Sequence, residues 1–179
     1  LAGLNAINAF LFAGTVVDIV PHAMDQRFTL TEGSLIFIVW GGSIIAGNLA
    51  SSLSDNFGQL KVYLVGALFG AVSATILGHI ELVTHPERFF IGAIMSGFSL
   101  GILRSAVFSL TSRLLEGPNS GKINGTILLV FGVFGAIGAY VPGAIFDGSG
   151  SYRLAFLIMT MILALGVALS TVLGRTNKP

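Results

Sequence analysis

Long apolar stretches separated by short polar segments dominate the sequence. A helix needs about 20 mostly apolar residues to cross the hydrocarbon core of a bilayer. Strands of a transmembrane barrel alternate polar and apolar positions in segments about half as long, whereas these stretches are apolar on every face. The pattern therefore predicts an all-α membrane protein, a single six-transmembrane-helix bundle over residues 1–179. The expected spans are 3–21, 33–53, 62–80, 89–110, 123–146 and 154–173.

The composition agrees with a membrane protein and excludes several classes of function. Hydrophobic residues make up 54% of the chain and charged residues only 9%, against about 25% charged in soluble domains. A net charge of +1 is too small for a nucleic-acid-binding surface. The chain has no cysteine, and we expect its histidines, His22, His79 and His85, in or beside outer loops. We therefore expect no metal site, no cofactor and no buried histidine proton relay.

The distribution of lysine and arginine predicts the orientation, since cytoplasmic loops carry an excess of both. The side that holds the 54–61 loop has five of them and the opposite side has three. The loop and both chain ends are therefore expected in the cytoplasm, in a multi-pass protein of a plasma or bacterial inner membrane. Because the chain starts at Leu1 and not at methionine, we expect a processed start or a piece of a longer protein.

An internal repeat is visible when the chain is shifted by 92 positions. Each copy, about 1–84 and about 85–179, then contains three spans, and because three is odd the second copy is inverted in the membrane. Inverted repeats are typical of transporters; the alternative is a coincidence among glycines and aspartates at helix ends. The superposed pairs are Gly33 with Gly125, Asp55 with Asp147, Gly58 with Gly150 and Lys61 with Arg153.

The repeated aspartate, glycine and basic residue have a physical rationale. An aspartate at the end of one span can accept hydrogen bonds from the free amides that open the next helix, and glycine permits a tight turn. The basic residue can pair with a carboxylate or with lipid phosphate. We favour a gating role for Asp55 and Lys61, and a simple interfacial anchor for Asp147 and Arg153.

Four segments together resemble the major facilitator superfamily. The segment at 54–61 is similar to that family's cytoplasmic loop motif, and 88–92 resembles its arginine-glycine motif. The segment 132–143 resembles its glycine-proline motif, and 147–156 is similar to the turn before the last span.

The resemblance covers the whole chain as one six-helix half of a twelve-helix transporter. Ser51 stands where glycine is usual, and Gln59 and Leu60 replace basic residues. Such erosion is more typical of the second half, so we interpret the chain as spans seven to twelve. The resemblance implies that the first and fourth helices of a half line the substrate cavity and that the second and fifth face the other half. The implied partners are the lipid bilayer, a small solute and the other six-helix half, which lies either upstream on the same chain or on a second subunit.

Placing an ionisable residue inside a membrane span costs free energy, so such residues usually have a function. Arg104 in the fourth span suits a carboxylate or phosphate group of a substrate, or else extends its head to the interface as a packing residue. Asp18 in the first span is a candidate for proton coupling or substrate contact, or an interfacial carboxylate. Their different depths argue against a direct contact. Asn5 and Asn8 either line the cavity or lie at its cytoplasmic mouth.

Glycines in the spans have a different expected role. Gly66 with Gly70, and Gly97 with Gly101, are spaced to let helices approach closely. Gly138 and Pro142 predict a bendable fifth span, because proline removes a backbone hydrogen bond.

The sequence therefore predicts a secondary active transporter, or half of one, that moves a small solute such as an organic anion by alternating access. The alternative is a structural or assembly subunit that keeps the bundle without transporting. An enzyme is not expected, because the spans offer no histidine cluster, no carboxylate pair and no nucleophile with a base in reach.

Overall fold

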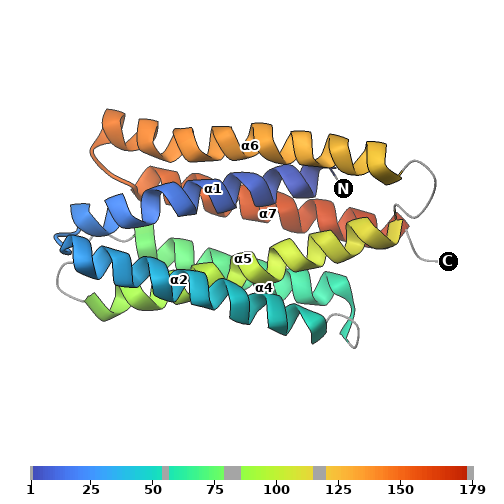
Figure 1. The fold of residues 1–179 in the computed structure, drawn as a ribbon, viewed down its shortest axis with the longest axis horizontal. Helices are drawn as coiled ribbons and strands as arrows, with labels where there is room; N and C mark the ends of the chain where they lie inside the picture. The colour runs from blue at the N-terminus through green and yellow to red at the C-terminus, as the bar shows by residue number, and fades with distance from the viewer. Residues whose placement is uncertain (1, 54–56, 79–85, 115–119, 177–179) are drawn as a thin grey trace.

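Six long helices run side by side along one axis in the computed structural model (Figure 1). The structure describes residues 2–53, 57–78, 86–114 and 120–176. All six helices are long and apolar enough to cross a membrane, which confirms the six predicted spans. The elements are α1 (Ala2–Asp25), α2 (Leu30–Ala50), the short 3-10 helix η1 (Ser51–Leu53), α4 (Gln59–Gly78), α5 (Pro86–Leu114), α6 (Ser120–Ser149) and α7 (Arg153–Thr176).

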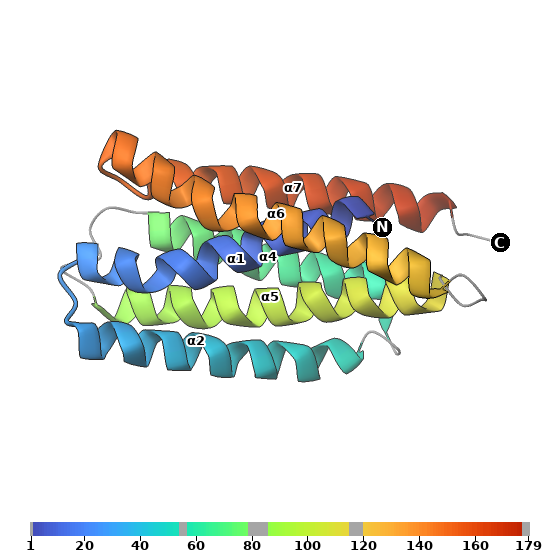
Figure 2. The same cartoon turned by 45° about the horizontal axis from the view of Figure 1, so that its top comes forward.

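The helices pack in a defined order. α1 packs chiefly against α6, α2 against α5, and α4 against both α5 and α7. The start of α1 and the end of α7 lie at the same end of the bundle in both views (Figures 1 and 2). α1 and α5 are the most buried helices, with 61% of their most apolar stretch buried, whereas the corresponding share is 28% for α2 and 11% for α6.

The link between α1 and α2 is shorter than predicted. We expected a loop from Pro21 to Glu32, but α1 continues through Pro21 to Asp25. Proline is tolerated inside membrane helices because neighbouring groups satisfy the freed backbone atoms. Arg27, with φ 66°, turns the chain. A capping box then starts α2, in which Thr29 Oγ1 accepts from the Glu32 amide and Glu32 accepts from the Thr29 amide.

The turn between α6 and α7 also differs from expectation. α6 extends to Ser149, so Asp147 lies exposed in its last turn instead of opening the turn. Gly150 ends the helix with φ 66°, and its amide donates to the Phe146 carbonyl at 2.7 Å. The amide that opens α7, on Arg153, donates to Ser151 Oγ at 3.2 Å. Asp147 is therefore not the cap of the next helix; a serine is.

Glycines lie where helix backbones approach most closely. A methyl group placed on Gly97 would meet the Trp40 carbonyl oxygen of α2, and one on Gly101 would meet the Ile44 carbonyl oxygen. On α6, a methyl group on Gly138 would meet the Phe10 carbonyl oxygen of α1. These contacts bring α5 onto α2 and α6 onto α1.

The contacts of Gly66 and Gly70 are with side chains. A methyl group would lie 2.8 Å from Ile102 Cγ2 at Gly66 and 2.7 Å from Ser99 Oγ at Gly70, both on α5.

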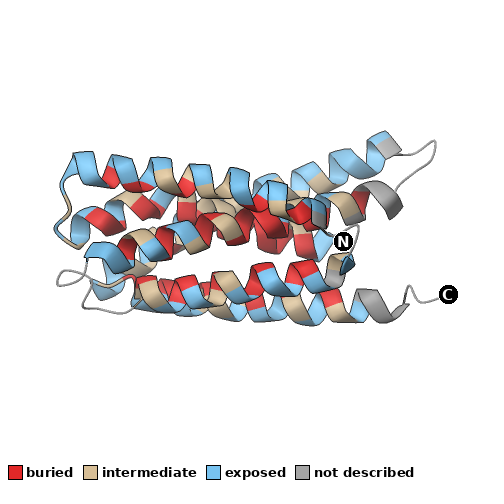
Figure 3. Cartoon of the chain, turned by 90° about the horizontal axis from the view of Figure 1, so that it is seen from below, coloured by how far each residue is buried: buried red, intermediate tan, exposed pale blue. Residues whose placement is uncertain are grey.

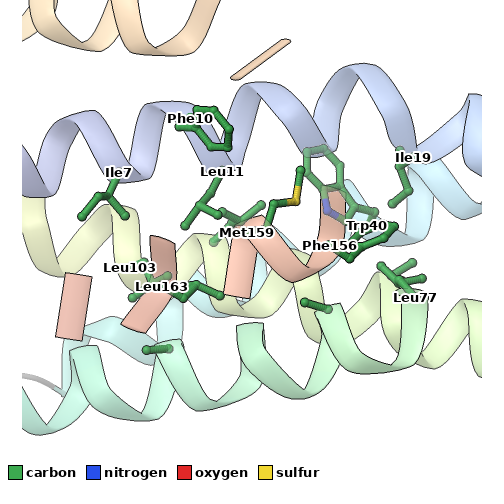
Figure 4. Close-up of a cluster of buried hydrophobic side chains, with 14 of the residues drawn as sticks. Ile7, Phe10, Leu11, Ile19, Trp40, Leu77, Leu103, Phe156, Met159 and Leu163 are labelled. Atoms are coloured by element: carbon green, nitrogen blue, oxygen red, sulfur yellow. The ribbon is translucent and has the colours of Figure 1, made fainter. Parts of the chain in front are cut away.

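Buried residues lie along the inward faces of the helices, and exposed residues lie on the outside (Figure 3). Figure 4 shows Leu11 of α1, Leu77 of α4, Leu103 of α5 and Met159 of α7 directed into one shared interior. The same interior holds small cavities, one of which includes an ionisable residue.

Candidate substrate and ion pathway

Arg104 is an exposed cation in the membrane-spanning part of the long α5 helix. Its guanidinium carbon lies 5.3 Å from the centre of the Phe12 ring of α1 and 6.0 Å from that of Phe131 of α6. A guanidinium held over aromatic faces is stabilised by their quadrupoles. The side chain is thus fixed where α1, α5 and α6 meet, with its charge accessible on the surface of this bundle.

Asn8 is directed into the bundle. It is buried, and its Nδ2 donates to the Leu103 carbonyl oxygen of α5 at 3.3 Å, while its Oδ1 has no partner. Asn5, one turn earlier on α1, is half-buried. Asn8 therefore tightens the contact of α1 with α5 and presents one unpaired oxygen inside it.

Asp18 lies deep between helices, with only 6% of its surface exposed. Its Oδ2 is buried and has no hydrogen-bond partner. Within the described residues Arg104 and Asp18 form no ion pair, in line with their expected difference in depth. Asp18 lines a cavity of about 10 Å³ together with Thr15, Leu77 and Tyr152.

His22, which we expected in or beside an outer loop, is a buried residue of α1. It lies in the last part of α1, 4% exposed, one turn after Asp18. Its Nε2 donates to the Leu77 carbonyl oxygen of α4 at 2.9 Å, and its Nδ1 is buried without a partner. Its spacing of four residues from Asp18 would place both side chains on one face of a helix. We did not use this spacing, because the first span was expected to end at Pro21.

The loop motif is only partly described. Gly58 has φ 88°, the left-handed region that glycine enters without strain, and Lys61 is exposed at the start of α4. Asp55 lies outside the described residues. Gln59, which replaces a basic residue of the family motif, donates to Ser109 Oγ at 2.9 Å and so joins the start of α4 to α5.

Neither a metal site nor a cofactor was expected. The part of the chain that the structure describes has no group of three or more histidine, cysteine, aspartate or glutamate residues able to hold a metal ion.

Two comparisons with known proteins give the family. The sequence profile of the Major Facilitator Superfamily matches residues 1–179, the whole chain. The chain is also 26% identical over 142 residues to multidrug resistance protein 2 of Bacillus subtilis (strain 168), a match that covers 78% of this chain and 34% of that relative. The chain thus spans about a third of the relative's length. The expectation of a membrane transporter family, and not of an enzyme, is confirmed by these matches. The chain belongs to the major facilitator superfamily.

Proposed function

We propose that this chain forms one six-helix half of a secondary active transporter that moves a small organic anion by alternating access. The family and the six spans support a multi-pass membrane transporter. The name of the B. subtilis relative, a multidrug resistance protein, agrees with a small-molecule solute.

Arg104 is the single observation that carries the anion assignment. It combines a permanent charge with five donors in a planar fork, which matches a carboxylate or phosphate. Phe12 and Phe131 hold this fork in place while leaving it accessible. An arginine directed toward lipid headgroups would not need ring contacts from two other helices.

The inverted three-helix repeat has two supports in the structure. The positive-φ glycines of the described chain are Gly58 and Gly150, which the 92-residue shift superposes. The shift also exchanges α1 with α5 and α2 with α6, and the main helix pairs follow this exchange, since α1 packs on α6 and α5 packs on α2.

The position of the chain within a longer transporter is part of the proposal. α2 and α6 are the least buried helices, as expected for the two that would face another six-helix half. We assign this chain to the second half because its loop motif has lost basic residues of the family pattern. We place the 54–61 loop and both chain ends in the cytoplasm because lysine and arginine are more frequent on that side.

The same assignment implies which residues act in gating, in anchoring a turn and in bending α6. Asp55 and Lys61 act at the cytoplasmic gate, whereas Asp147 and Arg153, both exposed, anchor the opposite turn. Pro142, fully buried inside α6, serves as the point at which this helix bends.

A matched pair of ligands tests the anion assignment. Benzoate and benzamide have nearly the same shape, but only benzoate is charged. We expect benzoate, and not benzamide, to raise the unfolding temperature of the intact protein, and Arg104→Ala to abolish the difference. Equal shifts from the two ligands, or a benzoate effect that survives in Arg104→Ala, would refute the assignment.

A further inference from the structure

Two unpaired polar atoms lie one helical turn apart inside the bundle. Asp18 Oδ2 and His22 Nδ1 are both buried, and neither has a hydrogen-bond partner. Residues four apart on a helix share a face, with about 5–6 Å between their Cβ atoms. Buried polar groups are nearly always paired, so two orphans this close need an explanation.

The hydrogen bond between His22 and Leu77 determines which ring nitrogen of His22 carries a hydrogen. Its Nε2 is bonded to the Leu77 carbonyl, which can only accept, so Nε2 carries a hydrogen. In the neutral ring Nδ1 is then a bare acceptor. The Asp18 carboxylate is also an acceptor only. The two atoms form no hydrogen bond with each other in the structure, and one added proton would convert one of these two acceptors into a donor.

Three aromatic rings pack around the His22 ring. The His22 ring centre lies 4.8 Å from that of Tyr152 and 5.2 Å from those of Phe89 and Phe156. These rings keep water away from the imidazole, and this desolvation by itself disfavours a charged ring, so a charge there needs an anionic group close by. The carboxylate one turn away supplies the counter-charge.

A cavity lies beside the pair and suits a single water. It has about 10 Å³ and is lined by Asp18 together with Leu77, Tyr152 and Phe156, the last three of which also contact His22. This is about the space that one water needs. Because Asp18 lines this cavity and three of its other lining residues contact His22, a water held there would lie beside both side chains.

Other titratable groups near the pair do not replace either partner. Asp25 acts on His22 through its charge. Burial, together with the charges of Asp18, Asp25 and Asp147, raises the pKa of Tyr152 to about 12, so that its phenol stays protonated. On the α4 and α5 sides the residues that meet His22 are Leu77 and Phe89, while the charged residues that open α5, Glu87 and Arg88, are exposed.

We propose that Asp18 and His22 form one proton-binding site in the interior of this six-helix bundle, in which a single proton is shared between Asp18 Oδ2 and His22 Nδ1. A cation that needs several anionic oxygen ligands is disfavoured, since Asp18 is the one anionic residue among the described residues that line the cavity. The further step, that this proton is the coupling ion, rests on the proposed transport function.

A proton-uptake titration of the intact protein in detergent tests the shared site without any transported solute. Wild type is compared with Asp18→Asn and with His22→Gln, whose amide keeps a donor for the Leu77 carbonyl. If the proton is shared, the first proton-binding midpoint of wild type lies at least one pH unit above that of both variants. If the two groups titrate independently, the wild-type midpoint equals the higher of the two variant midpoints, and the proposal is wrong.

Two controls complete the design. Glu32→Gln, which removes an exposed carboxylate at the start of α2, is expected to leave the first midpoint within about 0.3 pH units, well inside the spread of roughly one unit that pKa values show in proteins. Replacing sodium chloride with choline chloride should change nothing, and a sodium-dependent midpoint would assign the site to sodium instead.

The design stays decisive if His22→Gln does not fold. The ¹⁵N resonances of His22 are then followed in wild type and Asp18→Asn, and a midpoint that falls by less than one pH unit overturns the proposal. A titration that contradicts the shared proton would not affect the proposed role of Arg104. A benzoate response that is unchanged in Arg104→Ala would not affect the proposed proton site.

Discussion

Arg104 lies over the Phe12 ring, 5.3 Å from its centre, and the two residues are 92 positions apart, the same offset that superposes the two parts of the sequence. Under the proposed repeat they occupy equivalent positions on α5 and α1. Equivalent residues of two units related by a two-fold axis touch each other only near that axis. The proposed repeat therefore accounts for the contact between Arg104 of α5 and Phe12 of α1.

Phe12→Leu is expected to weaken anion binding without removing the charge. Leucine keeps an apolar contact but loses the aromatic face, and an exposed cation–π contact contributes about 0.5–1 kcal/mol. We expect benzoate affinity to fall roughly two- to fivefold, as measured by a binding titration on the intact protein. Phe37→Leu, on α2 beside Trp40, serves as the control. Equal affinities in wild type and Phe12→Leu would show that the ring does not hold the guanidinium for binding.

Gly138→Ala should destabilise the bundle, because its new methyl group would meet the Phe10 backbone carbonyl oxygen. Overpacking of this kind costs about 1–3 kcal/mol. Gly132→Ala, on the same helix with nothing within 4 Å, should be neutral or stabilising, since alanine is the better helix former. Unfolding in detergent measures both. A Gly138→Ala protein as stable as Gly132→Ala would contradict the close contact of α6 with α1.

Pro142→Ala tests the proposed bend in α6. Alanine restores the backbone N–H that proline lacks, which stiffens the helix. Transport should slow at least threefold while the benzoate affinity stays within about twofold, roughly the limits set by a change of 0.4–0.7 kcal/mol. Pro21→Ala, the exposed proline inside α1, is the matched control. Unchanged transport in Pro142→Ala would remove this residue from the mechanism.

The orientation can be measured directly because the chain has no cysteine. Ser52 and Ser149 are both exposed, at η1 and at the end of α6. A membrane-impermeant maleimide applied to intact cells should label Ser149→Cys and should reach Ser52→Cys only after permeabilisation. The reverse pattern would invert the proposed orientation, and labelling of both from one side would contradict the inverted repeat.

The spans could be predicted because a stretch of about 20 apolar residues has few alternatives to crossing a bilayer. Their ends were harder to predict. Pro21 looked like a helix terminator, yet α1 continues to Asp25, since a proline inside a packed bundle can be compensated by its neighbours. Asp147 was expected as an interfacial anchor, with a cap on the next helix as the other role of the motif, and it is the Ser151 hydroxyl that accepts the opening amide of α7.

The candidate site could be predicted only residue by residue. Arg104 and Asp18 were identifiable because charge inside a span is rare. The rings over Arg104 come from α1 and α6, and no sequence spacing relates residues on three different helices. His22 was missed for the same reason, because its burial depends on Leu77 and Tyr152, which are far away in the chain.

Uptake of radiolabelled carboxylates, benzoate among them, into proteoliposomes containing the intact protein tests the central claim most directly. We predict that wild type accumulates at least one of them above empty liposomes. Arg104→Ala should reduce that uptake at least tenfold, a loss of about 1.4 kcal/mol or more, and Arg104→Lys should retain an intermediate rate. Arg153→Ala, an exposed arginine at the start of α7, should stay within about twofold of wild type. Uptake that is unchanged in Arg104→Ala, or no carboxylate uptake by wild type, would contradict the account.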